Sequence, residues 1–166
     1  MKKLFYLSTL FFAILLFTGC PYSSELPIDS PSVKVKKEML GTYESRSSKE
    51  DKYVVTAKDD NTYKIVKTTK SSSDKTTYEG FISNVNSVPF INLYEVNEYD
   101  DATTKKTYYL YKLVAPEGST MITLVPVTEN IDETFETSEE LKKFISANSS
   151  LSFFYEKEED DYIKVK

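Results

Sequence analysis

The sequence has no histidine or tryptophan, one cysteine and four glycines among its 166 residues. Without histidine, the chain cannot build Ser-His-Asp or Cys-His catalysis, the usual zinc sites or the commonest acid–base group near neutral pH. One cysteine allows no internal disulfide, and so few glycines cannot furnish a glycine-rich phosphate loop. We therefore predict a protein that is not an enzyme, with no catalytic residue, metal site or cofactor.

Positive charge is also scarce, since 21 basic residues stand against 26 acidic ones and the formal net charge is -5. This balance argues against nucleic acid as a partner. Aromatic residues are abundant, with 13 tyrosines and 10 phenylalanines. Together with frequent threonine and valine they favour strands, so the composition predicts a mainly β protein.

The amino terminus has the pattern of an export signal. Lys2 and Lys3 precede an almost unbroken apolar run from Leu4 to Phe17. A membrane-spanning helix usually needs ~20 apolar residues, and this run is shorter. A basic head followed by a short apolar run predicts a signal peptide.

The tetrapeptide Phe17-Thr18-Gly19-Cys20 at the end of this run resembles the lipobox of bacterial lipoproteins. The resemblance implies a lipoprotein signal peptide over residues 1–19, cleavage after Gly19 and acylation of Cys20. Such a protein lies in the bacterial cell envelope, anchored to a membrane by its lipid and facing the periplasm or the cell exterior. The alternative is an ordinary signal peptide with a free thiol, or a buried cysteine.

Residues 21–32 read PYSSELPIDSPS, with three prolines and no periodic apolar pattern. This composition is typical of a flexible or semi-extended linker. We therefore expect residues 20–32 to form a flexible tether, followed by a single β-rich domain over residues 33–166.

Short runs of β-branched and aromatic residues, separated by polar clusters, fill most of that domain. They predict consecutive antiparallel strands at 39–45, 53–57, 62–68, 76–83, 88–96, 107–115 and 120–127. The capping-box sequence Thr137-Ser138-Glu139-Glu140 precedes apolar residues at helical spacing and predicts a helix over about 138–147. Closing strands are expected at 151–155 and 162–165.

This order of elements resembles the lipocalin-like barrels of small bacterial lipoproteins. Gly41-Thr42-Tyr43 lies where lipocalins carry Gly-x-Trp on their first strand. The resemblance implies a mainly β fold: an antiparallel up-and-down barrel or strongly bent meander, with one helix before the closing strand or strands. A β-sandwich, or an open sheet packed against the helix, is the alternative.

The strand at 107–115 carries the candidate cavity residues. Alternation places Tyr109, Tyr111 and Leu113 on one face and Tyr108, Leu110 and Lys112 on the other. Because a lysine avoids the interior, we place the first set inward. In a barrel these residues line a ligand cavity, with tyrosine hydroxyls to orient the ligand, or they belong to a filled core.

Two functions follow as expectations. The first is a membrane-anchored, non-enzymatic domain that binds a small apolar or amphipathic ligand or serves as a structural component of the envelope. The second is a protein-interaction module, such as an inhibitor of an external enzyme or an accessory subunit, whose acidic surface suits a basic partner such as a lysozyme. The long segments 97–106 and 128–136 are the candidate loops for that role.

Overall fold

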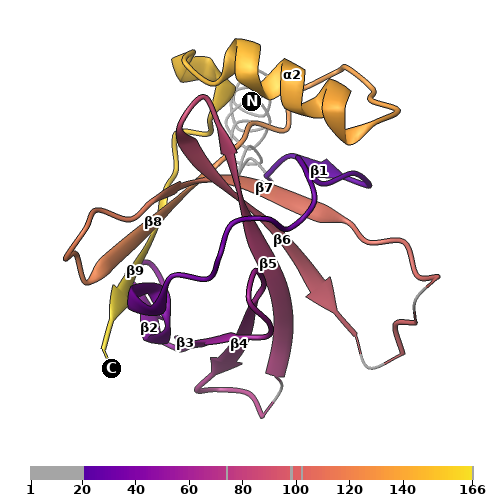
Figure 1. Ribbon diagram of the computed structural model, residues 1–166. Coiled ribbons are helices and arrows are strands. Elements are labelled where there is room, and N and C mark those ends of the chain that lie inside the picture. The colour runs from indigo at the N-terminus through magenta and orange to yellow at the C-terminus, as the bar shows by residue number, and fades with distance from the viewer. Residues whose placement is uncertain (1–20, 74, 98, 102, 166) are drawn as a thin grey trace, which may run out of the picture.

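The computed structural model describes residues 21–165 except residues 74, 98 and 102. It is a closed antiparallel barrel of eight strands (Figure 1). The strands are β2 (Gly41–Ser45), β3 (Asp51–Ala57), β4 (Tyr63–Thr69), β5 (Lys75–Val85), β6 (Val88–Val96), β7 (Tyr108–Val114), β8 (Met121–Pro126) and β9 (Asp160–Lys164). Strands β2 to β8 each pair with the next, and β9 closes the barrel by pairing with both β8 and β2. This confirms the mainly β prediction and is consistent with a lipocalin-like barrel.

The β5–β6 hairpin is the tightest connection in the barrel. Asn86 and Ser87 form its turn with φ of 51° and 66°. Asparagine tolerates this left-handed conformation because its short polar side chain bonds locally. Further along the hairpin a Cβ on Gly80 would lie 2.5 Å from the Leu93 side chain and 3.0 Å from the Asn92 carbonyl oxygen. Glycine there lets the two strands approach closely as the sheet coils.

Helix α2 (Ser138–Asn148) is the one α-helix of the described residues and precedes the final strand, and the capping-box residue Thr137 marks its start. Thr137 Oγ1 accepts a hydrogen bond from the Glu140 N–H at 3.2 Å, which satisfies one of the free donors of the first turn. Leu141 and Ile145 are fully buried, so this face of the helix packs against the barrel from outside.

The prediction of a closing strand at 151–155 is wrong. This stretch forms the 3-10 turn η2 (Ser152–Phe154), and only Tyr155 makes an isolated β-bridge, to Val127. The Leu151 N–H donates to the Asn148 carbonyl at 2.9 Å, so the chain turns tightly as it leaves the helix. Phe154 is buried beside α2. The aromatic residues that led to the strand prediction at 151–155 therefore serve to pack this turn against the helix.

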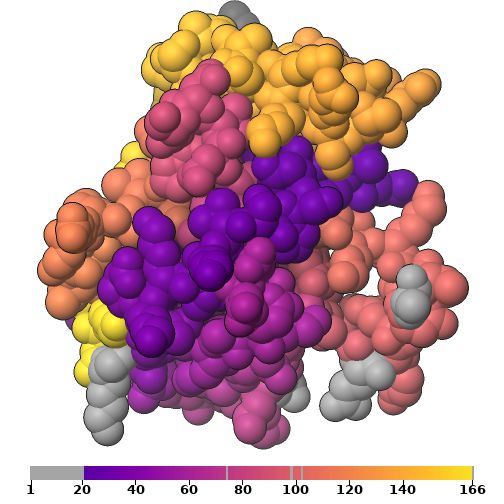
Figure 2. Space-filling model, in the orientation of Figure 1, coloured from indigo at the N-terminus to yellow at the C-terminus, as the bar shows by residue number. Residues whose placement is uncertain are grey.

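The structure also corrects the prediction of a flexible tether over residues 20–32. Residues 21–32 pack on the barrel, where β1 (Ser23–Ser24) pairs with β7 and Ile28 is completely buried. The Ile28 N–H donates to Asn92 Oδ1 at 2.8 Å. In Figure 2 this indigo segment crosses the face of the molecule directly below α2. The folded unit therefore includes residues 21–32, because the apolar outer face of β6 and β7 needs a cover.

Two apolar clusters result. The outer cluster lies between the barrel, the N-terminal segment and α2, with Phe90, Leu110 and Val127 at its centre. The inner cluster lies inside the barrel, where Met39 of the short turn η1 (Lys37–Met39) packs with Tyr63, Ile82 and Leu113. The inner cluster does not fill the barrel, because Met39, Tyr63 and Leu113 also line a cavity.

Candidate ligand-binding cavity

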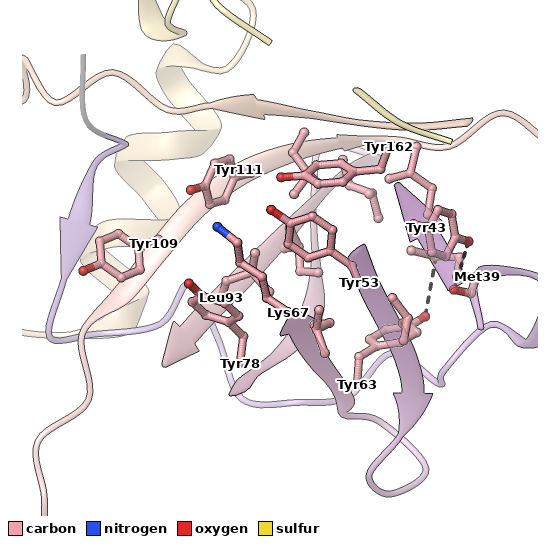
Figure 3. A pocket seen from close by; sticks show the side chains of 16 residues that line it. Met39, Tyr43, Tyr53, Tyr63, Lys67, Tyr78, Leu93, Tyr109, Tyr111 and Tyr162 are labelled. Atoms are coloured by element: carbon pink, nitrogen blue, oxygen red, sulfur yellow. Dashed lines mark hydrogen bonds between the residues drawn. The ribbon is translucent and has the colours of Figure 1, made fainter. Parts of the chain in front are cut away.

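The barrel contains a cavity of about 200 Å³ lined by seven tyrosines, eight apolar side chains and one lysine. The tyrosines are Tyr43, Tyr53, Tyr63, Tyr78, Tyr109, Tyr111 and Tyr162. The apolar residues are Met39, Val55, Ile65, Ile91, Leu93, Leu113, Ile122 and Leu124, and the lysine is Lys67. More than half of the tyrosines in the sequence therefore gather around one space (Figure 3).

Strand alternation explains why these side chains point inward. On β7, Tyr109, Tyr111 and Leu113 all line the cavity, on the face that the sequence assigns to the interior. Leu110 of the same strand belongs to the outer cluster, and Lys112 places its ammonium 5.2 Å from the Tyr155 ring outside the barrel. In the described structure these three side chains border the cavity, and Leu113 belongs to the inner cluster as well.

One end of the cavity is closed. Tyr43 and Tyr63 are almost fully buried there, and both contact Met39. The Tyr43 hydroxyl donates to the Met39 carbonyl at 3.0 Å, and the Tyr63 hydroxyl accepts a bond from the Lys36 N–H at 2.9 Å. These bonds fix the segment with η1 across the barrel end, so a ligand has no entry on this side.

The other end carries the half-buried Tyr53, Tyr78 and Tyr109, together with Lys67. Figure 3 shows the Lys67 ammonium directed among the hydroxyl groups of Tyr53, Tyr78 and Tyr111. The Lys67 side chain is 30% exposed and lies 3.2 Å from Asp51 Oδ2, whose side chain is 14% exposed. The ion pair thus sits at the mouth of the cavity.

The electrostatics of the mouth keep Lys67 charged. Burial lowers the pKa of Lys67, but the hydrogen bond and charge of Asp51 outweigh it, and the net pKa lies above its ordinary value. The Thr69 hydroxyl, which donates to Asp51 Oδ1 at 2.6 Å, holds the pKa of Asp51 below its usual range with the help of Lys67. Both groups are therefore ionised at neutral pH.

Two tyrosines of the cavity, Tyr111 and Tyr162, are in contrast held neutral. Burial raises the pKa of Tyr111 and of Tyr162 far above the ordinary value, and the carboxylate of Asp160 adds to the effect. The rings of Tyr53 and Tyr162 meet edge to face with centroids 5.0 Å apart. At neutral pH these residues present apolar rings and hydroxyl groups that can donate or accept.

A second polar cluster lies on the outer side of the barrel, and it is structural. Asp29 accepts hydrogen bonds from the Ser83 hydroxyl and, at 2.6 Å, from the Lys142 ammonium. Asn92 links the Ser83 hydroxyl to the Ile28 N–H. This network ties the N-terminal segment, β5, β6 and α2 together.

The groups that line the cavity are apolar side chains, tyrosine hydroxyls and one ammonium. Within the described part of the chain, no group of three or more carboxylate or thiol side chains could hold a metal ion. A lysine that acts as a base or nucleophile needs a lowered pKa, and the pKa of Lys67 is raised. The arrangement can enclose an apolar body and offer one cation with several neutral hydroxyls.

Lys67 was not predicted to line the cavity, although the alternation of residues along β4 indicates that its side chain points inward. Tyr63, Ile65 and Lys67 alternate on β4, so the residues before Lys67 already marked its face as interior. The general rule that lysine avoids the interior argued against an inward position for Lys67. The rule fails here because Asp51 from the neighbouring strand pairs with the buried cation.

Gly19 and Cys20, the predicted cleavage and lipidation sites, lie outside the described residues. No helix among residues 21–165, apart from the three gaps, is long and apolar enough to cross a membrane. Comparisons with protein-family models, with curated proteins and with solved structures each found no match to this chain.

Proposed function

We propose that this protein binds a small apolar or amphipathic molecule inside its barrel and catalyses no reaction. The observation that carries the proposal is the cavity itself, with its wall of tyrosines and aliphatic side chains. An eight-stranded barrel of this size can be filled by its own side chains or hold one small ligand. The volume of about 200 Å³ is below the roughly 300–1,000 Å³ of pockets for drug-sized ligands. The ligand is therefore a single short chain or ring.

The ionisation states of the wall support binding over catalysis. General acids and bases work best with a pKa near the operating pH. Here the pKa of Lys67 is raised and the pKa values of Tyr111 and Tyr162 are raised as well, so these groups keep their protons at neutral pH. A wall with fixed protonation suits a site that holds its ligand unchanged.

The test is native mass spectrometry of residues 21–166, purified without detergent from a bacterial host. We expect a stoichiometric extra mass from a co-purifying small molecule. Leu124→Trp places a bulky ring in the cavity and should remove this mass, whereas Val114→Trp on the outer face of the neighbouring strand should retain it. The proposal would be contradicted if the wild-type protein carried no extra mass. It would also be contradicted if Leu124→Trp and Val114→Trp retained the same fraction of the bound molecule.

We further propose that lipid chains on Cys20 anchor the protein to a bacterial membrane. The signal-peptide pattern and the lipobox resemblance support this. Pro21, the next residue, forms a β-bridge with Thr128, and the Tyr22 N–H donates to the Val127 carbonyl at 2.9 Å. Such an anchor would hold the barrel close to the bilayer, without a long tether. Cys20→Ala should abolish labelling by a fatty-acid probe in the host, and normal labelling of that variant would refute the anchor.

A second candidate is the protein-interaction module, favoured by one surface feature. Tyr99 is 94% exposed in the connection between β6 and β7, and the carboxylates of Asp100 and Asp101 follow it. Exposed tyrosines are enriched in binding hot spots, and acidic neighbours suit a basic partner. Inhibition of a lysozyme by the wild type, and loss of that inhibition in Tyr99→Ala, would support this function. Equal inhibition by the two proteins would show that Tyr99 does not contact the lysozyme.

A further inference from the structure

We infer that the cavity selects an amphipathic anion, whose acidic head group binds at Lys67 and whose apolar tail points toward Met39. This inference rests on the proposed ligand-binding function and names the ligand class. It is carried by the uneven distribution of polar groups along the cavity and by the position of its one charged side chain.

The cavity is polar at its mouth and apolar at its floor. The floor is formed by Met39, Leu113 and Ile122 with their aliphatic neighbours and by the rings of Tyr43 and Tyr63. The hydroxyls of these two tyrosines are bonded to the Met39 carbonyl and the Lys36 N–H. The mouth carries Lys67 and the hydroxyl groups that surround it. A ligand with one polar end and one apolar end can satisfy both regions in only one orientation, with its tail inward.

Lys67 determines which charge the polar end of the ligand should carry. Among the described residues that line the cavity it alone carries a charge. Its ammonium has three N–H donors, so Asp51 at 3.2 Å leaves capacity for an oxygen of the ligand. The neutral hydroxyls of Tyr53, Tyr78 and Tyr111 can donate to the same acidic group, which strengthens its binding in a half-buried site.

A cationic ligand fits this mouth less well. Seven tyrosine rings could attract a quaternary ammonium group through their faces. The Lys67 ammonium lies among the rings at the mouth, however, and would repel a second cation in surroundings where charges are poorly screened. The geometry therefore favours a carboxylate or a similar acidic group over a cation or a neutral head.

The experiment compares three probes that share a ten-carbon chain: decanoate, 1-decanol and decyltrimethylammonium. Residues 21–166 contain every barrel strand and both apolar clusters, so they suffice for the measurement. The chain has no tryptophan, so its tyrosine emission is directly visible and reports on ligand in a tyrosine-lined cavity. At pH 7 we expect decanoate to bind about tenfold or more tightly than either other probe, as a charge-assisted bond implies.

Two lysines of the same strand supply a matched pair of variants. Lys67→Met should weaken decanoate binding about ten- to hundredfold and leave 1-decanol binding nearly unchanged. Lys64→Met removes an exposed lysine from the outer face of β4 and should change neither affinity. Retained 1-decanol binding in Lys67→Met shows in the same titration that the variant is folded and its cavity intact.

The outcomes separate this inference from the proposed function. Equal binding of decanoate and 1-decanol by the wild type, or tightest binding of decyltrimethylammonium, would overturn the anion selectivity while leaving a ligand-binding barrel. An equal effect of Lys67→Met and Lys64→Met on decanoate would remove Lys67 as the head-group site. If none of the probes binds and no small molecule co-purifies, the proposed function itself fails.

Discussion

Replacing Ile28 with alanine should lower the free energy of unfolding by about 3–4 kcal/mol. Ile28 is 0% exposed and packs in the outer cluster against Phe90, Leu110 and Val127. The change removes three buried carbons, each worth roughly 0.8 kcal/mol of transfer free energy. A cavity term adds to this loss, because the barrel wall behind Ile28 is a paired sheet and cannot collapse into the space.

The assay is urea unfolding of residues 21–166, followed by far-ultraviolet circular dichroism. Ile163→Ala is the matched control, since Ile163 is 42% exposed on β9 and its loss should cost under about 1 kcal/mol. A loss below about 0.5 kcal/mol in Ile28→Ala would falsify the reasoning. It would mean that residues 21–32 contribute no packing and behave as the tether that their composition predicts.

Two further predictions concern the helix and the barrel end. Leu141→Ala should cost about 3 kcal/mol because Leu141 is fully buried, and Phe144→Ala less, about 1–2 kcal/mol, because its ring is half-buried on the same face of α2. A reversed order in urea unfolding would mean that Phe144 contributes more to the packing of this face than Leu141. Burial, with the charges of Glu158 and Asp161, raises the pKa of Asp160, so its carboxylate destabilises the fold at neutral pH and the cost disappears as pH falls toward the ordinary value of 3.8. Asp160→Asn should therefore raise the urea midpoint at pH 7 and lose this advantage at pH 4, and an equal difference at both pH values would contradict the assignment.

The cavity and the N-terminal segment, residues 21–32, share the strands β6 and β7. The N-terminal segment covers the outer face of β6 and β7, and the inner faces of the same strands supply Ile91, Leu93, Tyr109 and Tyr111 to the cavity. The cavity and the packing of residues 21–32 therefore lie on opposite faces of one pair of strands. This explains why the outer face is closed by hydrogen bonds to Asp29 and Asn92, while the inner face keeps unfilled space.

The sequence alone determined the local elements. Runs of β-branched and aromatic residues between polar clusters located the barrel strands, with 88–96 matching β6 at both ends. The same signal wrongly placed a strand at 151–155. Thr137 and Glu140 located the start of α2, since the capping bonds are made between residues three apart. Period-two alternation along one strand assigned Tyr109, Tyr111 and Leu113 to the interior.

Only the tertiary structure decided how these elements combine. The packing of residues 21–32 depends on Ile28 meeting Phe90 and Leu110, and a segment without periodicity carries no local sign of such a contact. Lys67 is stable at an interior position because Asp51, from another strand, lies 3.2 Å away. Whether tyrosines fill a barrel or leave a cavity depends on how side-chain volumes from all eight strands add up around one axis. That sum is a property of the closed barrel, and no single strand determines it.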